Sequence, residues 1–219
     1  MGSSPAARIF SNRIHLRIDR GSSVDNRMTS VTSVLKTQAL VLGGTLAVFW
    51  AVFLVNTVLG GSLLTLGVIP RAMIGLRGIL FAPFLHGSLN HLAANSIPFL
   101  ALGWMVMLRD ERHFIPVTLA GMIGSGLTAW LLGAPGSVHI GASGVIFGYL
   151  GFLMLTGWYT RSFISILLSV IVTLFWGSLV FGIMPGEPGI SWQSHIGGFL
   201  GGVFAARALR TPQRLPSAT

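Results

Sequence analysis

Apolar residues in this chain gather into six long runs, separated by shorter stretches that are polar or rich in glycine and proline. A helix needs about 20 apolar residues to cross the hydrocarbon core of a bilayer. Each of the six runs comes close to that length, so the pattern predicts an all-α membrane protein with six transmembrane helices. We expect these helices at residues 38–59, 89–108, 114–132, 140–157, 163–183 and 192–209.

The segments outside the runs differ in kind. Residues 1–36 are polar and predict a mostly disordered tail, with a short surface helix at residues 8–18 as an option. Residues 60–88 are too apolar for an ordinary solvated loop, so we expect them to lie in the membrane interface, buried against the bundle. The predicted organisation is therefore a tail over residues 1–36, a six-helix core over residues 37–210 and a short second tail over residues 211–219.

Composition agrees with this class of protein. Only 9% of the residues are charged and the mean hydropathy is +0.77, whereas soluble domains carry about 25% charged residues. The net charge of +9 is explained by basic segments on the cytoplasmic face rather than by a nucleic-acid partner. If the amino terminus is inside, twelve basic residues face the cytoplasm and two, Arg71 and Arg77, face outward. Both termini are therefore predicted to be cytoplasmic.

Amino-acid usage narrows the chemistry and the location. The chain has no cysteine, which excludes disulfides, thiolate metal sites and a cysteine nucleophile. Arginine greatly outnumbers lysine, which hints at a GC-rich bacterial genome, and we expect the plasma membrane of a bacterium. The Arg- and Ser-rich start also fits a mitochondrial transit peptide, which is the minor alternative.

Two stripes of small residues predict where helices approach each other closely. Glycines recur on one face of the fourth predicted span, and Ser143 lies beside them; in the sixth span His195 shares a face with glycines. The stripe residues are Gly141, Gly144, Gly148 and Gly151, and then Gly198 and Gly202. A serine and a histidine on two such seams can meet as a nucleophile and its general base. Taken singly, the serine can bond to its own helix backbone and the histidine can be structural.

An acid to complete a triad is missing from the predicted spans. The acidic residues are Asp19, Asp25, Asp110, Glu111 and Glu187. Glu187 lies in an outer loop within possible reach of His195, but a loop rich in proline and glycine orients a side chain poorly. A Ser–His dyad is therefore the sharper hypothesis.

His91 and Asn95 lie four residues apart, on one face of the second predicted span. Their side chains and the Ser143 backbone N–H could hold the negative charge that develops on a substrate carbonyl oxygen. The structural alternative is a helix cap with hydrogen bonds between helices. His86 is expected to tie down the 60–88 loop. Its spacing from His91 is wrong for a shared metal, so we predict no metal and no cofactor.

Three motifs together resemble the rhomboid family of intramembrane serine proteases. They are Gly141-Ala142-Ser143-Gly144, His91-x-x-x-Asn95 and His195-x-x-Gly198-x-x-x-Gly202, and the resemblance covers residues 38–209. It implies a bacterial-type six-helix bundle in which Ser143 is the nucleophile, His195 the general base, and His91, Asn95 and Gly141 stabilise the oxyanion.

The resemblance also implies how substrates are handled. Transmembrane proteins would be cleaved near their outer ends, residues 60–88 would form a half-submerged first loop, and the fifth span with residues 184–191 would form the substrate gate. Supporting roles fall to Gly144, Phe147, Gly198, Gly202, His86 and Arg77.

The chain departs from the family pattern at three places, because Leu76-Arg77 stands for a Trp-Arg pair, Phe147 for a tyrosine and Ser194 for an alanine. None of these changes removes a catalytic group, and Phe147 can still stack on an imidazole.

The predicted function is therefore a serine endopeptidase that works inside the bilayer through an acyl-enzyme, with transmembrane proteins and lipid as its partners. Its activity should fall at acidic pH, because the base must be neutral. The alternative is a catalytically silent rhomboid-like protein that binds membrane clients. A small transporter is less favoured, since internal repeats and half-broken helices are not evident. The oligomeric state is left open.

Overall fold

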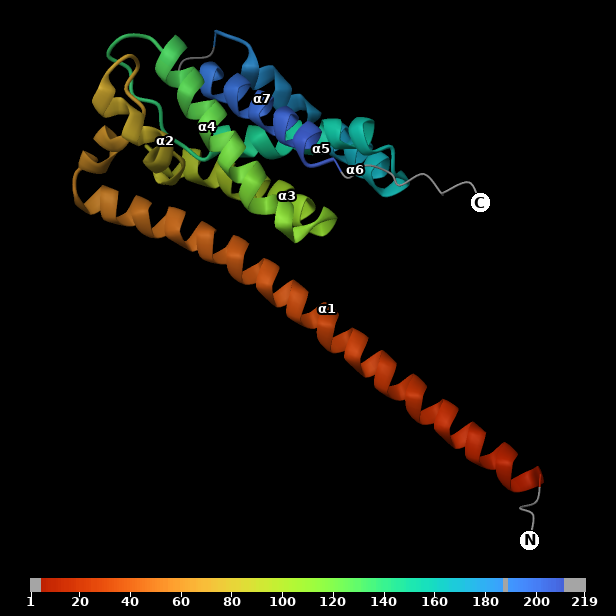
Figure 1. Cartoon of the computed structure of the whole chain (residues 1–219). Coiled ribbons are helices and arrows are strands. Elements are labelled where there is room, and N and C mark those ends of the chain that lie inside the picture. The colour runs from red at the N-terminus through yellow and green to blue at the C-terminus, as the bar shows by residue number, and fades with distance from the viewer. Residues whose placement is uncertain (1–4, 187–188, 211–219) are drawn as a thin grey trace. The chain divides into compact units, whose positions relative to one another are not determined.

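The computed structural model describes residues 5–186 and 189–210, with side chains from residue 31 onward, and this part of the chain is helical. Figure 1 shows the long helices in chain order. They are α1 (Pro5–Val58), α3 (Leu89–Arg109), α4 (Phe114–Leu132), α5 (Ser143–Thr160), α6 (Phe163–Trp176) and α7 (Trp192–Ala208). Among the described residues, strand-like pairing is limited to one isolated bridge, between Val68 and His139.

A helix lies at each of the six predicted places. Within the described residues, four segments are long and apolar enough to cross a membrane: Val31–Val58, Leu89–Arg109, Glu111–Leu132 and Phe163–Ile183. The last of these combines α6 with the 3-10 helix η5 (Gly177–Ile183). The protein is therefore an integral membrane protein by composition. That α5 and α7 also cross the bilayer, and that both termini are cytoplasmic, stay predictions.

The segment that was predicted as a tail, residues 1–36, differs from the prediction. It is helical from Pro5 onward, where a mostly disordered tail was expected. Proline is well tolerated at the first position of a helix, and the next proline along the chain is Pro70. The helix therefore meets no proline before its end at Val58. The cytoplasmic location of this segment stays a prediction, and the predicted tail at 211–219 lies outside the described residues.

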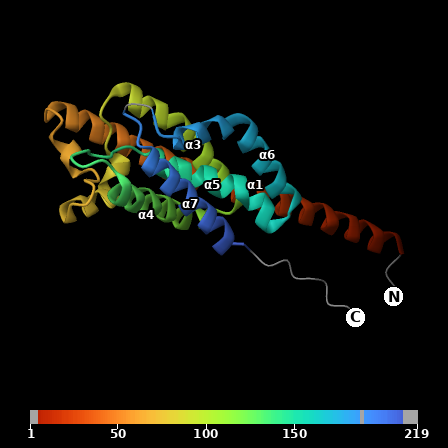
Figure 2. The same ribbon diagram turned by 90° about the horizontal axis from the view of Figure 1, so that it is seen from above.

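Helix α5 is the central helix of residues 42–210. This helix contacts α3, α4, α6 and α7, and Figure 2 shows it between α3 on one side and α4 and α7 on the other. The predicted glycine seam is confirmed at Gly144, Gly148, Gly198 and Gly202. A Cβ atom at Gly198 would overlap the carbonyl oxygen of Gly144, and one at Gly202 would overlap that of Gly148. Only glycine lets α5 and α7 approach so closely.

The segment between α1 and α3 is folded against the bundle, as predicted. It contains η1 (Ser62–Leu66), η2 (Met73–Arg77), α2 (Gly78–Phe81) and η3 (Ala82–Phe84). The Arg71 backbone N–H donates to the Trp130 carbonyl, and the Trp130 indole donates to the Ala72 carbonyl, at 3.0 and 2.9 Å. These bonds hold the segment to the end of α4. Its position in the membrane interface stays a prediction.

Candidate active site

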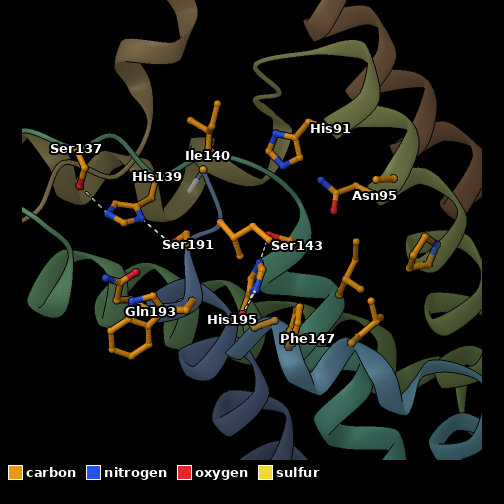
Figure 3. A pocket seen from close by; sticks show the side chains of 18 of the residues that line it. His91, Asn95, Ser137, His139, Ile140, Ser143, Phe147, Ser191, Gln193 and His195 are labelled. Atoms are coloured by element: carbon orange, nitrogen blue, oxygen red, sulfur yellow. Dashed lines mark hydrogen bonds between the residues drawn. The ribbon is translucent and has the colours of Figure 1, made fainter. Parts of the chain in front are cut away.

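Ser143 and His195 come together, as their glycine seams predicted. Ser143 is the first residue of α5, and His195 lies in the first turn of α7. The Ser143 Oγ lies 2.8 Å from Nε2 of His195, and Figure 3 draws this bond at the centre of the site. The close approach of α5 and α7 through their glycines brings the two side chains within hydrogen-bonding distance.

The second ring nitrogen of His195 defines the direction of that bond. Nδ1 lies 2.9 Å from the carbonyl oxygen of Gly182, in η5. A carbonyl can only accept, so Nδ1 carries the proton and Nε2 of the neutral ring accepts from the Ser143 hydroxyl. The ring also stacks on Phe147, with centroids 4.1 Å apart and planes 10° apart. The hydrogen bond and the stack together fix both the tautomer and the plane of the imidazole.

A backbone carbonyl thus occupies the position that a carboxylate holds in a triad. Among the described residues that line the cavity around Ser143, none is acidic. Glu187, which the sequence left as an option, lies outside the described residues. The geometry that is described is that of a Ser–His pair oriented by the main chain.

The turn before Ser143 depends on Gly141. The φ angle of Gly141 is +112°, and a Cβ atom there would lie 2.6 Å from Nε2 of His91. The Gly141 N–H donates to the Ala82 carbonyl at 2.8 Å, and the Ala142 N–H points to Nε2 of His86 at 3.5 Å. Gly141 therefore precedes the helix, and its prediction as a member of the α5 stripe was wrong. Its lack of a side chain makes room for His91 instead.

His91 and Asn95 face the same cavity as the Ser–His pair. They lie on α3, whose amino terminus is capped by Ser88, and in Figure 3 both point toward the side on which Ser143 lies. Asn95 is 6% exposed, and its Nδ2 has no hydrogen-bond partner among the described residues. A buried amide donor without a partner costs free energy, so this donor is available to an oxygen that enters the cavity.

The cavity itself has a volume of about 960 Å³. Its lining combines the Ser–His pair with residues from α3, η5 and the segments before α5 and α7. Such a volume fits an extended stretch of peptide with its side chains, since ligand pockets for drug-sized molecules span about 300–1,000 Å³. It is therefore large enough for a segment of another polypeptide.

Comparison with known proteins identifies the family of this chain. A profile of the Rhomboid domain matches residues 74–212, which is more than half of the chain. The chain belongs to the rhomboid family. An uncharacterized protein of Mycobacterium tuberculosis is 38% identical to this rhomboid over 199 residues, 85% of this chain and 83% of that protein.

Relatives with more informative names match a smaller share of their own length. RHOMBOID-like protein 1 of Arabidopsis thaliana is 30% identical over 162 residues, which cover 67% of this chain and 40% of that protein. Rhomboid protease GluP of Bacillus subtilis is 32% identical over 131 residues, 59% of this chain and 25% of that protein. The similarity therefore extends to a named rhomboid protease.

The other residues predicted for this rhomboid site lie in different places. His86 is 1% exposed and contacts both the Ala142 backbone and the ring of His91, so it ties the 60–88 loop to the site as expected. Gly198 and Gly202 lie in the seam with α5. Arg77 donates to the Thr65 carbonyl at 3.1 Å within its own loop and does not line the cavity. The supporting role of Arg77 stays a prediction.

Some residues at this rhomboid site were missed by sequence reasoning. The Gly182 carbonyl is a main-chain group, which leaves no residue-type signal. His139 and Ser191 line the cavity and are hydrogen-bonded to each other. Their signal was present, because His139 precedes Ser143 by four residues just as Ser191 precedes His195 by four.

Proposed function

We propose that this rhomboid is an active intramembrane serine endopeptidase that works through a Ser143–His195 dyad and an acyl-enzyme. The observation that carries the proposal is the 2.8 Å bond from Ser143 Oγ to His195 Nε2, in a ring whose Nδ1–H is held by the Gly182 carbonyl. A neutral imidazole with a free Nε2 lone pair directed at a hydroxyl is the arrangement that a general base requires.

The proposed reaction has two halves. Nε2 of His195 takes the Ser143 proton as Oγ attacks the scissile carbonyl carbon, and the same Nε2–H then protonates the departing amine, which leaves the acyl-enzyme. Water enters in place of the amine, gives its proton to Nε2, and releases the carboxylic acid while Ser143 regains its proton. The Gly182 carbonyl accepts from Nδ1 throughout, so it stabilises the imidazolium that forms in each half.

The negative charge on the carbonyl oxygen needs donors. Asn95 Nδ2 has no other partner among the described residues, and His91 stands beside it on α3. With the Ser143 backbone N–H they form the proposed oxyanion site. Donors that are already oriented toward developing charge stabilise the transition state without reorganisation.

The proposed substrates are transmembrane segments of other proteins, cut near their outer ends. The cavity borders η5, which follows α6, and α6 exposes most of its side chains. Separation of the fifth span, which is α6 with η5, and of residues 184–191 from the bundle would let a substrate helix enter from the side. We place both termini in the cytoplasm, in a bacterial plasma membrane, because twelve basic residues are then inside and two outside.

The test is cleavage of a generic transmembrane substrate in liposomes, together with labelling by a fluorophosphonate probe. We expect Ser143→Ala to abolish both cleavage and labelling, and His195→Ala to abolish cleavage. Equal cleavage by wild type and both variants would refute the dyad. Cleavage by none of them, with binding of the substrate retained, would favour the silent client-binding protein instead.

A further inference from the structure

A second histidine–serine pair lies beside Ser143 and His195. Nδ1 of His139 lies 2.6 Å from Oγ of Ser191, and both residues line the same cavity as the dyad. The two pairs join the same two segments of chain, 139–143 and 191–195, with histidine and serine exchanged between them (Figure 3). This pair takes no part in the proton transfers proposed above.

The second pair is part of a small network of hydroxyl groups at the start of α7. The Ser191 Oγ lies 2.7 Å from Oγ of Ser194. Nδ1 of His139 is hydrogen-bonded to the same Ser191 oxygen, and the tautomer of His139 sets which of the two atoms donates. The same oxygen accepts from the Ser194 backbone N–H at 3.3 Å, because Ser191 is the amino-terminal cap of α7. His139 thus binds the cap of the helix that carries His195.

His139 is itself held firmly on the side of Ser143. Its Nε2 lies 3.0 Å from Oγ of Ser137, and its backbone pairs in both directions with Val68, at 2.9 Å each. The residue is 9% exposed. The ring therefore has little freedom to follow α7. The bond to Ser191 instead fixes the start of α7 relative to the segment that leads into Ser143.

We propose that His139 is a positioning residue, which holds the first turn of α7 so that His195 stays within hydrogen-bonding distance of Ser143. The inference rests on the proposed function. The other contacts of His195, with Phe147 and the Gly182 carbonyl, act on its ring, whereas the His139–Ser191 bond acts on the helix start.

The distinction matters during substrate entry. Gly182 belongs to η5, within the proposed gate, and its contact with His195 depends on where η5 lies. The bond from His139 does not run through η5. Its partner Ser191 is the last residue of the proposed gate and the cap of α7, so the bond sets where the moving segment ends and holds α7 when η5 is displaced. A misplacement of reacting groups by about 1 Å can cost about 10²-fold in rate, and this sets the scale of the effect.

The test compares three variants of the full-length protein. His139→Leu removes the hydrogen bond to Ser191. His139→Asn keeps a side-chain amide, which can donate or accept, close to the place of Nδ1 and is the conservative variant. His113→Leu is the matched control, because His113 lies beside Phe152 at the opposite end of α4 from the 133–142 segment. Each is measured for kcat and KM on the transmembrane substrate, for the rate of fluorophosphonate labelling, and for amide hydrogen exchange over residues 190–197.

We expect His139→Leu to lower kcat and the labelling rate by about 10- to 100-fold, with KM changed by less than about threefold, and to speed hydrogen exchange at the start of α7. His139→Asn should recover most of both rates, and His113→Leu should match wild type. Wild-type kcat and exchange in His139→Leu, with Ser143→Ala inactive, would overturn the positioning role alone. Full cleavage by Ser143→Ala would overturn the proposed function, and this inference with it.

Discussion

Helices α5 and α6 are neighbours along the chain and both are strongly apolar, yet their surroundings are opposite. Every residue of α5 from Gly144 to Leu153 is buried, against α3, α4, α6 and α7. In α6 the buried residues are Ser165 and Val172, while Leu174 and Phe175 are 76% and 73% exposed. Hydropathy alone does not distinguish the two helices. The glycines of α5 do, because they let other helices approach it on several sides.

This difference divides the proposed site into a fixed and a more weakly held part. Ser143 begins the buried helix, and His91 and Asn95 stand on α3, which contacts it. The acceptor for His195 Nδ1 is Gly182, in the segment that follows the exposed helix. If that segment moves to admit a substrate, the nucleophile keeps its place while the base loses its orienting carbonyl. Full orientation of the base would then return only when the segment closes again.

The largest effect is expected from a substitution in the glycine seam between α5 and α7, which supports the fixed part of the site. A Cβ atom at Gly202 would overlap the carbonyl oxygen of Gly148, and a backbone atom cannot rotate away. Gly202→Ala should therefore cost about 3 kcal/mol of stability, at the upper end of ordinary overpacking, and should abolish activity. Thermal unfolding in detergent micelles measures the loss.

The matched control for that variant is Gly177→Ala, at the end of α6. There the nearest atom to the new Cβ is Thr173 Cγ2 at 3.6 Å, an ordinary contact. We expect its unfolding midpoint to stay close to that of wild type. Equal midpoints for Gly202→Ala and Gly177→Ala would contradict the claim that the α5–α7 seam stabilises the fold.

The next effect concerns the donor that α3 holds beside Ser143. Asn95→Ala should lower kcat by about 10²–10³-fold, the usual cost of removing one oxyanion donor, and KM should change much less. Steady-state cleavage in liposomes gives both constants. Ser96→Ala is the control on the same helix, because its hydroxyl bonds to the Leu92 carbonyl of its own helix. A kcat for Asn95→Ala equal to that of Ser96→Ala would remove Asn95 from the proposed oxyanion site.

The sequence predicted the buried part of the site better than the exposed part. Small residues at helical spacing and polar residues inside apolar runs leave periodic signals, and these located the α5–α7 seam and the Ser143–His195 contact. The same periodicity misled at Gly141. In the sequence, a glycine that continues a helical stripe cannot be told from one that is needed for a positive φ. Gly141 is of the second kind.

Other features left a signal that was too weak to use, or none. The Gly182 carbonyl is a main-chain acceptor, so its role depends on where η5 folds and not on a residue type. Residues 5–36 are polar, which suggested disorder, but polarity does not stop a helix when no proline intervenes. Arg77 was included because of its family position, and its contacts keep it in its own loop. For these features, the sequence does not show which tertiary contacts the residues make.

The smallest effect is expected from loosening α6. Ser169 Oγ donates to the Leu153 carbonyl at 2.6 Å and accepts from the Gly157 N–H at 3.0 Å, so one hydroxyl ties α6 to α5. A hydrogen bond contributes about 1 kcal/mol net, which corresponds to about a fivefold change in an equilibrium. Ser169→Ala should therefore raise kcat/KM for a transmembrane substrate by up to about fivefold, because the proposed gate opens more often.

Fluorophosphonate labelling separates that gating effect from a change in chemistry. The probe is small and does not need the helices to part, so its rate should stay at the wild-type value in Ser169→Ala. Thr173→Val is the control, since the Thr173 hydroxyl bonds within α6, to the Ser169 carbonyl. The chain has no cysteine, so spin labels at Leu131→Cys and Phe175→Cys report the α4–α6 distance directly. A distance distribution no broader in Ser169→Ala than in Thr173→Val would mean that α6 is held by packing alone, and that its exposure does not make it the moving part.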